Sequence, residues 1–214
     1  MQLTLSTRRA LIAGAAAALL FTGAGGAVAA PAGPAAAAPS PAVPAAARAH
    51  SPYAALRPLA ALSAERLATG DLVAAAKWGT GSPIDDPARE QQVLDSVAEQ
   101  ARQLGADPAA TVQIFRDQIE ANKIVQRGLH RRWDADPSQA PAERPDLGEV
   151  RKEINRINTE LVRAIAASAP ARSAPSCHPL LALAGAGVRH ARHLDPLHTV
   201  ALARSLSSVC GEAG

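Results

Sequence analysis

The sequence predicts an all-α protein, a bundle of about six helices. Apolar residues recur at spacings of three and four along several segments, as they do on one face of a helix. No segment of useful length alternates with the period of two that a half-buried strand requires. Asp-Pro pairs at Asp86, Asp107 and Asp195 precede three of these segments. They predict helix starts, because Asp caps free N–H groups and Pro tolerates the first helical position.

The first 50 residues predict an exported chain. Arg8 and Arg9 precede an apolar run over residues 10–24, and Ala27-Val28-Ala29 fits a cleavage site. Residues 1–29 are therefore expected to be a secretory signal peptide. Residues 30–50 are rich in Ala and Pro and are expected to form a disordered spacer. We expect the folded domain over residues 51–214, secreted or periplasmic and free of the membrane after signal cleavage.

Charge and composition argue against a nucleic-acid partner. The formal net charge is +3, and Arg8 and Arg9 would leave with a signal peptide that holds no Asp or Glu. The mature chain is then close to neutral, and aromatic residues make up only 2% of the sequence. Neither a basic surface nor aromatic platforms for stacking bases are therefore indicated.

The chain holds two cysteines, Cys177 and Cys210. An even number in an exported protein suggests a disulfide, and two free buried thiols are the alternative. Such a bridge would close a loop of about 34 residues and stabilise the fold by roughly 3–4 kcal/mol in the chain-entropy model.

The folded domain is expected to begin near Ser51, and its first helix carries an apolar stripe at Leu56, Leu59, Leu62, Leu67, Val73 and Ala76. Pro58 should kink this helix or mark its start. Arg66 and Lys77 share one face, about 20° apart in azimuth and separated by about 16 Å of rise. Two such cations could bracket a small anion, whereas the alternative is a solvated basic stripe.

A loop over residues 79–83 leads to the second expected helix, which begins at Asp86-Pro87 and stops at Gly105. Its buried face should hold Leu94, Val97, Ala101 and Leu104. Arg89 lies in its first turn, where a cation is unfavourable beside the positive end of the helix dipole. This placement suggests an anion nearby, and the alternative is an Arg89 that is solvated or paired with Asp86.

The third expected helix begins at Asp107 and carries a long stripe at Val112, Phe115, Ile119, Asn122, Gln126, Leu129 and Trp133. Asn122 and Gln126 are its polar members, and they lie one turn apart, so their side chains point into the same space. A buried amide without a partner costs roughly 1–3 kcal/mol. We therefore expect a substrate to satisfy these two side chains.

A surface loop is expected over residues 134–145. A fourth helix follows, with Arg151 at the edge of a stripe formed by Leu147, Val150, Ile154, Ile157, Leu161 and Ile165. After another loop over residues 169–176, we expect a short apolar helix over residues 179–188. The last helix should start at Asp195-Pro196 and bury Leu197, Val200, Ala201 and Val209.

Metal and covalent chemistry find little support. His190 and His193 are helical neighbours and His198 lies beyond a helix start, but no Asp or Glu stands at ligand spacing on the same face. Motifs for a nucleophilic serine, a P-loop and a dinucleotide site are absent from the sequence. We therefore predict no metal and no cofactor.

The remaining candidates are four cations and two amides, namely Arg66, Lys77, Arg89, Arg151, Asn122 and Gln126. Four cations around one cavity repel each other unless an anion is bound, and arginine suits carboxylates. There is no evident nucleophile and no acid–base pair. Such a site would bind a polycarboxylate and stabilise charge.

At these residues the chain resembles the all-helical chorismate mutases of type II fold, in their secreted (gamma) class. The matching pieces are A-E-R-L around Arg66, A-K-W around Lys77, I-D-D-P-A-R-E at 84–90, D-Q-I-E-A-N-K-I-V-Q at 117–126, and P-D-L with Arg151. C-H-P at 177–179, R-H-L-D-P-L at 192–197 and Cys210 are similar to the extra C-terminal region of that class. The resemblance covers about residues 51–210.

The resemblance implies a Claisen rearrangement of chorismate to prephenate, a branch of aromatic amino-acid biosynthesis, without cofactor or covalent intermediate. It implies a homodimer in which Arg151 makes each site belong to one chain. The implied catalytic residues are Lys77, Gln126 and Arg66. The implied substrate-binding residues are Arg66, Lys77, Asp86, Arg89, Glu90, Asn122, Gln126 and Arg151.

In that reading each side chain has a role. Arg66, Arg89 and Arg151 would grip the two carboxylates of chorismate. Lys77 and Gln126 would donate hydrogen bonds to the ether oxygen as its bond breaks. Glu90 would take the ring hydroxyl, and Asn122 would help to hold a carboxylate.

Two positions depart from the secreted relatives, which carry Glu where Gln126 stands and Thr where Asn122 stands. Gln126 matches the cytoplasmic relatives instead. The competing function is an exported, non-catalytic helical module that binds an anionic small molecule or a partner protein. A third reading is a purely structural helical domain, whose melting temperature no ligand would raise.

Overall fold

The computed structural model describes residues 51–211 and confirms the all-α fold, with no strand among these residues. Its elements are α1 (Pro52–Lys77), α2 (Pro87–Gln103), α3 (Pro108–Ala135), the 3-10 helix η2 (Pro137–Gln139), α4 (Leu147–Ala167), α5 (Ala169–Arg172), α6 (Cys177–Ala191) and α7 (Pro196–Ser205). The predicted signal peptide and spacer, residues 1–29 and 30–50, lie outside the described residues, as do residues 212–214.

All three Asp-Pro pairs begin helices, as predicted. The Asp86 carboxylate accepts a hydrogen bond from the Arg89 N–H at 3.1 Å. Asp107 caps α3 in the same way through the Ala109 N–H at 2.8 Å, and Asp195 caps α7 through the His198 N–H at 2.8 Å. These ends follow from local chemistry, which explains why the sequence predicts them well.

Other boundaries differ from the prediction. Pro58 lies inside α1 and does not mark its start, because Ser51 supplies the cap and Pro52 takes the first helical position. The expected loop over residues 169–176 contains the single turn of α5. The expected loop over residues 134–145 contains the end of α3 and η2, whose first turn Asp136 caps.

Most of the predicted apolar stripes are buried, with two exceptions. Leu104 is 47% exposed, because α2 ends at Gln103 and Leu104 lies at its C-cap. Val200 is 60% exposed, because α7 packs through the face that carries Ala201 and Leu202. Periodicity alone shows neither where α2 ends nor which face of α7 packs inward.

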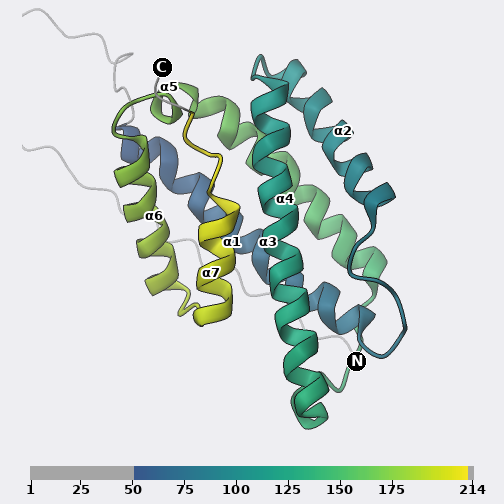
Figure 1. Ribbon diagram of the computed structural model, residues 1–214. Coiled ribbons are helices and arrows are strands. Elements are labelled where there is room, and N and C mark those ends of the chain that lie inside the picture. Colours follow the sequence, from purple (N-terminus) through teal and green to yellow (C-terminus); the bar gives the residue numbers. More distant parts are fainter. Residues whose placement is uncertain (1–50, 212–214) are drawn as a thin grey trace, which may run out of the picture. The chain divides into compact units, whose positions relative to one another are not determined.

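Helix α3 packs against α1, α2 and α7. Helix α1 also packs against α4 and α6, and α2 packs against α4. In Figure 1, α2 lies on one side of α4, while α6 and α7 lie on the other side. Helices α1 and α2 therefore pack against α3, which carries Asn122 and Gln126, and α4 packs against α1 and α2.

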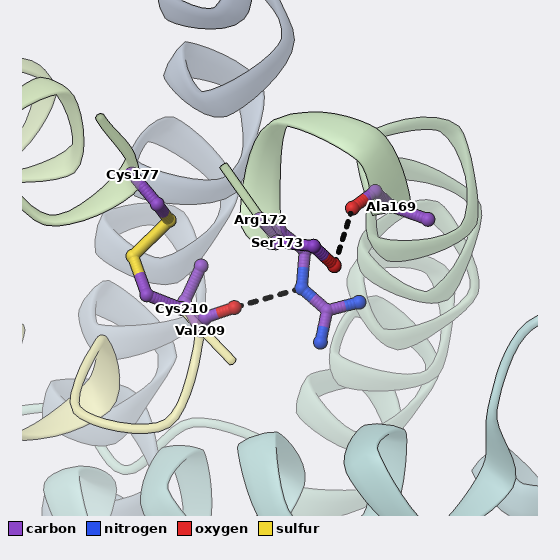
Figure 2. The surroundings of a disulfide bond; sticks show 6 residues. All are labelled: Ala169, Arg172, Ser173, Cys177, Val209 and Cys210. Carbon is purple, nitrogen blue, oxygen red and sulfur yellow. Dashed lines mark hydrogen bonds between the residues drawn. A yellow bond between two sulfur atoms is a disulfide. The ribbon is translucent and has the colours of Figure 1, made fainter. Parts of the chain in front are cut away.

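A disulfide joins Cys177, at the start of α6, to Cys210, after the end of α7 (Figure 2). This finding confirms the predicted pairing, and no free cysteine occurs among the described residues. Two hydrogen bonds, one from a side chain and one between backbone groups, tie the same region to α5. The Arg172 Nε donates to the Val209 carbonyl at 2.8 Å, and the Arg172 carbonyl accepts from the Gly211 N–H at 3.1 Å.

Reduction of the disulfide should lower the melting temperature by roughly 10 °C, given about 3–4 kcal/mol for a loop of this length. The turnover of molecules that remain folded should hardly change, because neither cysteine lines the pocket described below. Calorimetry with and without reductant measures the first effect. A Cys177→Ala, Cys210→Ala double variant is the control and should not respond to reductant. Two titratable thiols in freshly purified protein would contradict the pairing.

His198 connects α7 to α1 through two carboxylates. Its Nδ1 lies 2.7 Å from Asp195 Oδ1 and its Nε2 lies 2.9 Å from Asp71 Oδ1. Both ring nitrogens can donate only in the imidazolium form. The hydrogen bond to Asp71 is the largest influence on the pKa of His198. The hydrogen bonds to Asp71 and Asp195 together outweigh the effect of burial and raise this pKa from 6.5 to about 9.

The free energy of unfolding should therefore depend on the charge of His198. Because the pKa is higher in the folded state, the stabilisation is complete below about pH 6.5 and is lost as the pH rises through about 9. Chemical unfolding between pH 6 and 10 should show this decline, and His198→Gln should flatten it. Arg132 lies 3.6 Å from Asp195 and is the same in the wild type and the variant, so the difference between their slopes reports on His198. An equal slope in the variant would contradict the assignment.

Candidate active site

One pocket between α1, α2, α3 and α4 is lined by all eight of the predicted substrate-binding residues. It encloses about 700 Å³ including its open mouth. Helix α1 contributes Arg66 and Lys77, and α4 contributes Arg151. All of these side chains belong to one chain.

The rest of the lining is mostly apolar. It comprises Val73, Ile84, Val93, Ile119, Leu147 and Ile154. Apolar walls exclude water from the space between the charged groups, which strengthens their electrostatic interactions with a bound molecule. The pocket therefore combines fixed positive charge with a shaped apolar surface.

Arg66 is a buried cation, only 5% exposed. Its Nε donates to Asn158 Oδ1 at 3.0 Å, and its Nη1 donates to the Gln118 carbonyl at 2.8 Å. Burial lowers the pKa of Arg66 to about 10, so the guanidinium stays charged at neutral pH. Two neutral acceptors thus hold this charge in a fixed position.

The other three cations are more exposed than Arg66. The Lys77 Nζ donates to the carbonyls of Pro83 and Ile84, at 2.7 and 3.2 Å. Burial lowers the pKa of Lys77, Asp86 counteracts this, and the positive charge of Arg151 lowers it further. The Arg89 Nη1 donates to Gln92 Oε1 at 3.2 Å.

None of these four cations forms a salt bridge with any residue over 51–211, although other basic residues of the domain do. Their positive charge in the pocket is therefore not neutralised by direct ion pairs. Such an arrangement favours an anionic ligand that carries carboxylates, because arginine can grip a carboxylate through two parallel hydrogen bonds.

The two amides of α3 are largely satisfied by the protein. Asn122 Nδ2 donates to the Arg66 carbonyl at 3.2 Å, and Gln126 Nε2 donates to Asn122 Oδ1 at 2.7 Å. Gln126 is 4% exposed, and its Oε1 has no hydrogen-bond partner among residues 51–211. We expected a substrate to satisfy both amides, but the structure leaves open hydrogen-bonding capacity mainly on Gln126.

Glu90 and Asp86 form the acidic corner of the pocket. Asp86 caps α2, and Glu90 Oε1 accepts from the Asp86 N–H at 3.3 Å, which completes a reciprocal capping arrangement. Lys123 Nζ donates to both oxygens of Glu90 at 3.1 Å. The alternative in which Asp86 pairs with the Arg89 side chain does not occur.

Lys123 lines the pocket but was missed in the sequence analysis. It is buried and also forms salt bridges with Asp85 at 3.2 Å and Glu120 at 2.6 Å. Burial lowers the pKa of Lys123, but the hydrogen bonds to these carboxylates outweigh it and raise the pKa. Helical spacing could have identified the residue, because Lys123 follows Ile119 by one turn on the same face.

Residues 51–211 show neither a metal site nor a membrane span. No group of three or more His, Cys, Asp or Glu side chains gathers closely enough to hold a metal ion within that range. Over the same residues, no helix combines the length and the apolar character needed to cross a bilayer.

Comparison with known proteins gives consistent results. The family model for chorismate mutase type II matches residues 57–127. A secreted chorismate mutase of Mycolicibacterium smegmatis is 40% identical over 155 residues, which covers 72% of this chain and 86% of the relative. A secreted chorismate mutase of Mycobacterium tuberculosis is 36% identical over 155 residues, which covers 72% of this chain and 78% of that protein.

A solved structure is similar along most of its length. The crystal structure of a chorismate mutase from Burkholderia thailandensis superposes with a TM-score of 0.70 at 38% identity, covering 73% of this chain and 99% of that one. The extent of these matches, together with the helical fold, shows that this chain belongs to the chorismate mutase family, in its secreted class.

Proposed function

We propose that the pocket between α1 and α4 binds chorismate and catalyses its rearrangement to prephenate, with the eight residues named above in distinct roles. The observation that carries this assignment is the convergence, on a pocket with apolar walls, of four cations that have no ion-pair partner among residues 51–211. Chorismate brings two carboxylates and an ether oxygen that gains negative charge as its bond breaks. The residues and the charges of the substrate are therefore complementary.

Arg66, Arg89 and Arg151 hold the two carboxylates. Arg66 has the most fixed position, because Asn158 and the Gln118 carbonyl orient its guanidinium before any ligand binds. Donors that are oriented in advance need no reorganisation during the reaction. Arg151 is exposed and lines the pocket from α4.

Lys77 and Gln126 stabilise the breaking ether bond. The Lys77 ammonium has three N–H donors, of which two are engaged by the Pro83 and Ile84 carbonyls. The Gln126 amide has two N–H donors, of which Asn122 engages one. Each side chain thus keeps one donor for the oxygen on which negative charge develops.

The acidic corner binds the other end of the substrate. Glu90 accepts the ring hydroxyl, while Lys123 fixes the orientation of its carboxylate. Asp86 contributes a second carboxylate at this corner. On α3, the remaining N–H of Asn122 helps to hold a carboxylate of the substrate. The apolar walls compress a flexible molecule toward the reactive chair, an effect of proximity and orientation.

The loss of chorismate absorbance on mixing with the purified exported protein tests this proposal. Turnover without any added metal or cofactor is the expected result, together with a rise in melting temperature on binding. A rise in melting temperature without turnover would support the non-catalytic binding module instead. Neither effect would indicate a purely structural domain.

The names of the relatives from both mycobacterial species describe secreted proteins, which supports a secreted or periplasmic location for this chain.

We propose a homodimer in which each site is complete in one chain, because Arg151 reaches the pocket from α4 of the same chain. Turnover per chain should then be unchanged by dilution that dissociates the dimer, provided that the monomer stays folded.

A further inference from the structure

Two hydrogen bonds of fixed direction link α1 to the Gln126 side chain. The Arg66 backbone carbonyl accepts from Asn122 Nδ2, and Asn122 Oδ1 accepts from Gln126 Nε2. A backbone carbonyl can only accept a hydrogen bond. Asn122 must therefore present its NH₂ group to Arg66 and its oxygen to Gln126. Gln126 must in turn present its own NH₂ group, so neither amide can flip without placing two acceptors against each other.

Gly70 makes room for this arrangement. A Cβ atom at residue 70 would lie 3.1 Å from Asn122 Nδ2 and 3.3 Å from Val125 Cγ1. Gly70 is buried in the interior of α1, where glycine costs about 1 kcal/mol relative to alanine. The close approach of the Asn122 amide gives this unfavourable helix residue a physical reason.

We propose that Gly70, Asn122 and Gln126 form one positioning unit, in which Asn122 fixes the orientation of the Gln126 amide and directs one of its N–H groups to the breaking ether bond. Asn122 is then chiefly a positioning residue that acts through Gln126. The inference rests on the proposed role of Gln126 and adds the atom that performs it and the residues that aim it.

The number of N–H or O–H groups on residue 126 decides which side chain is suitable at residue 122. The Gln126 amide has two N–H groups for two acceptors, Asn122 Oδ1 and the ether oxygen. A carboxyl group introduced by Gln126→Glu has at most one O–H for the same two acceptors. A hydroxyl introduced by Asn122→Ser can donate its own hydrogen, which would release the O–H of the carboxyl group for the ether. The two substitutions should therefore compensate each other.

A double-mutant cycle measured by kcat at about pH 5 tests this compensation. Asn122→Ser alone should lower kcat roughly tenfold, because the Gln126 amide loses its fixed orientation. In the Gln126→Glu background the same substitution should raise kcat roughly tenfold. An equal fold-change in both backgrounds would overturn the coupling between the two residues.

Gly70→Ala provides a second test at a residue outside the pocket lining. The added methyl group should displace the Asn122 amide and lower kcat roughly tenfold, with a smaller effect on KM. In the Asn122→Ser background, where the amide is gone, Gly70→Ala should change kcat less than about twofold. If Gly70→Ala lowered kcat by the same factor in the wild-type and Asn122→Ser backgrounds, or in neither, the positioning unit would be contradicted.

Gly185→Ala is the matched control. It also adds a methyl group inside a helix, but its Cβ would lie 3.5 Å from Leu206 Cδ1, an ordinary contact remote from the pocket. It should leave kcat unchanged, and circular dichroism should show that every variant is folded.

A readout that is independent of catalysis separates this inference from the proposed function. In the ligand-free protein, NMR should show one Gln126 side-chain amide proton protected from exchange, and Asn122→Ser should abolish this protection. If the Gln126 amide proton is protected but the protein does not turn over chorismate, the positioning unit is supported and the proposed function is refuted. If the protein turns over chorismate but this proton is not protected, the function is supported and the positioning unit is refuted.

Discussion

Lys77→Ala is expected to lower kcat by on the order of 10³ at neutral pH. The ether oxygen gains negative charge as its bond breaks, and removing one donor at such an oxygen costs roughly 10²–10³ in rate. Lys77 belongs at the upper end of this range, because a charged donor forms the stronger hydrogen bond. KM should change less, because the arginines continue to hold the substrate carboxylates. Stopped-flow or steady-state loss of chorismate absorbance measures both constants.

Two controls separate this chemical role from a structural one. Lys77 also holds the loop before α2 through the carbonyls of Pro83 and Ile84, so its loss could loosen that loop. Asp85→Ala loosens the same loop by removing its contacts with Lys123 and Arg127, but it keeps the ammonium. Asp85→Ala should therefore raise KM, while kcat should stay close to the wild-type value.

Lys152→Ala removes an exposed lysine that pairs with Glu149 on α4, and it should have no effect on turnover. A kcat for Lys77→Ala within tenfold of the wild-type value would show that Lys77 does not donate a hydrogen bond to the ether oxygen.

The pH dependence of turnover offers a further check on Lys77. Burial is the largest influence on its pKa, and it lowers the pKa below 10.5 despite the attraction of Asp86. Only the protonated form can donate and carry charge. In the free enzyme the alkaline limb of kcat/KM should therefore begin at a lower pH than an exposed lysine would give. Lys77→Gln should leave only the loss of the Arg66 charge, whose pKa burial lowers to about 10.

The helix boundaries could be predicted where local chemistry decides them. Asp86, Asp107 and Asp195 cap their helices through bonds to residues two or three positions ahead, and the sequence shows such pairs directly. The single turn of α5 could not be predicted, because Arg172 contacts Val209 and Gly211 from a distant part of the chain. Leu104 and Val200 are exposed for a similar reason, since burial depends on which neighbour packs nearby.

The site was predictable to the extent that its residues share helix faces. Arg66 and Lys77 line the same pocket because eleven residues of helix return nearly to the same azimuth. The hydrogen bonds that orient Asn122 and Gln126 could not be foreseen, because they end on the backbone carbonyl of Arg66 in another helix. The position of Gly70 opposite Asn122 likewise depends on how closely α1 and α3 approach.

Gln126→Ala is expected to lower kcat by roughly 10²–10³, the scale of losing one neutral donor at the developing charge. An amide donates at every pH, so wild-type turnover should stay flat as the pH falls, until a carboxylate of the site or of the substrate is protonated. Arg127→Ala is a suitable control on the same helix. Its guanidinium pairs with Asp85 outside the pocket, so the loss of kcat should be small.

Gln126→Glu gives the sharpest test, because it changes the donor and keeps the shape. A carboxyl group donates only when protonated, so turnover should be weak at neutral pH and strongest at acid pH. Even there it should stay below the wild-type value, since one hydrogen must serve both Asn122 Oδ1 and the ether oxygen. A pH profile of kcat for the variant equal to that of the wild type would mean that Gln126 does not face the developing charge. The catalytic donors would then have to be sought on α1 and α4, and α3 would serve only to shape the pocket.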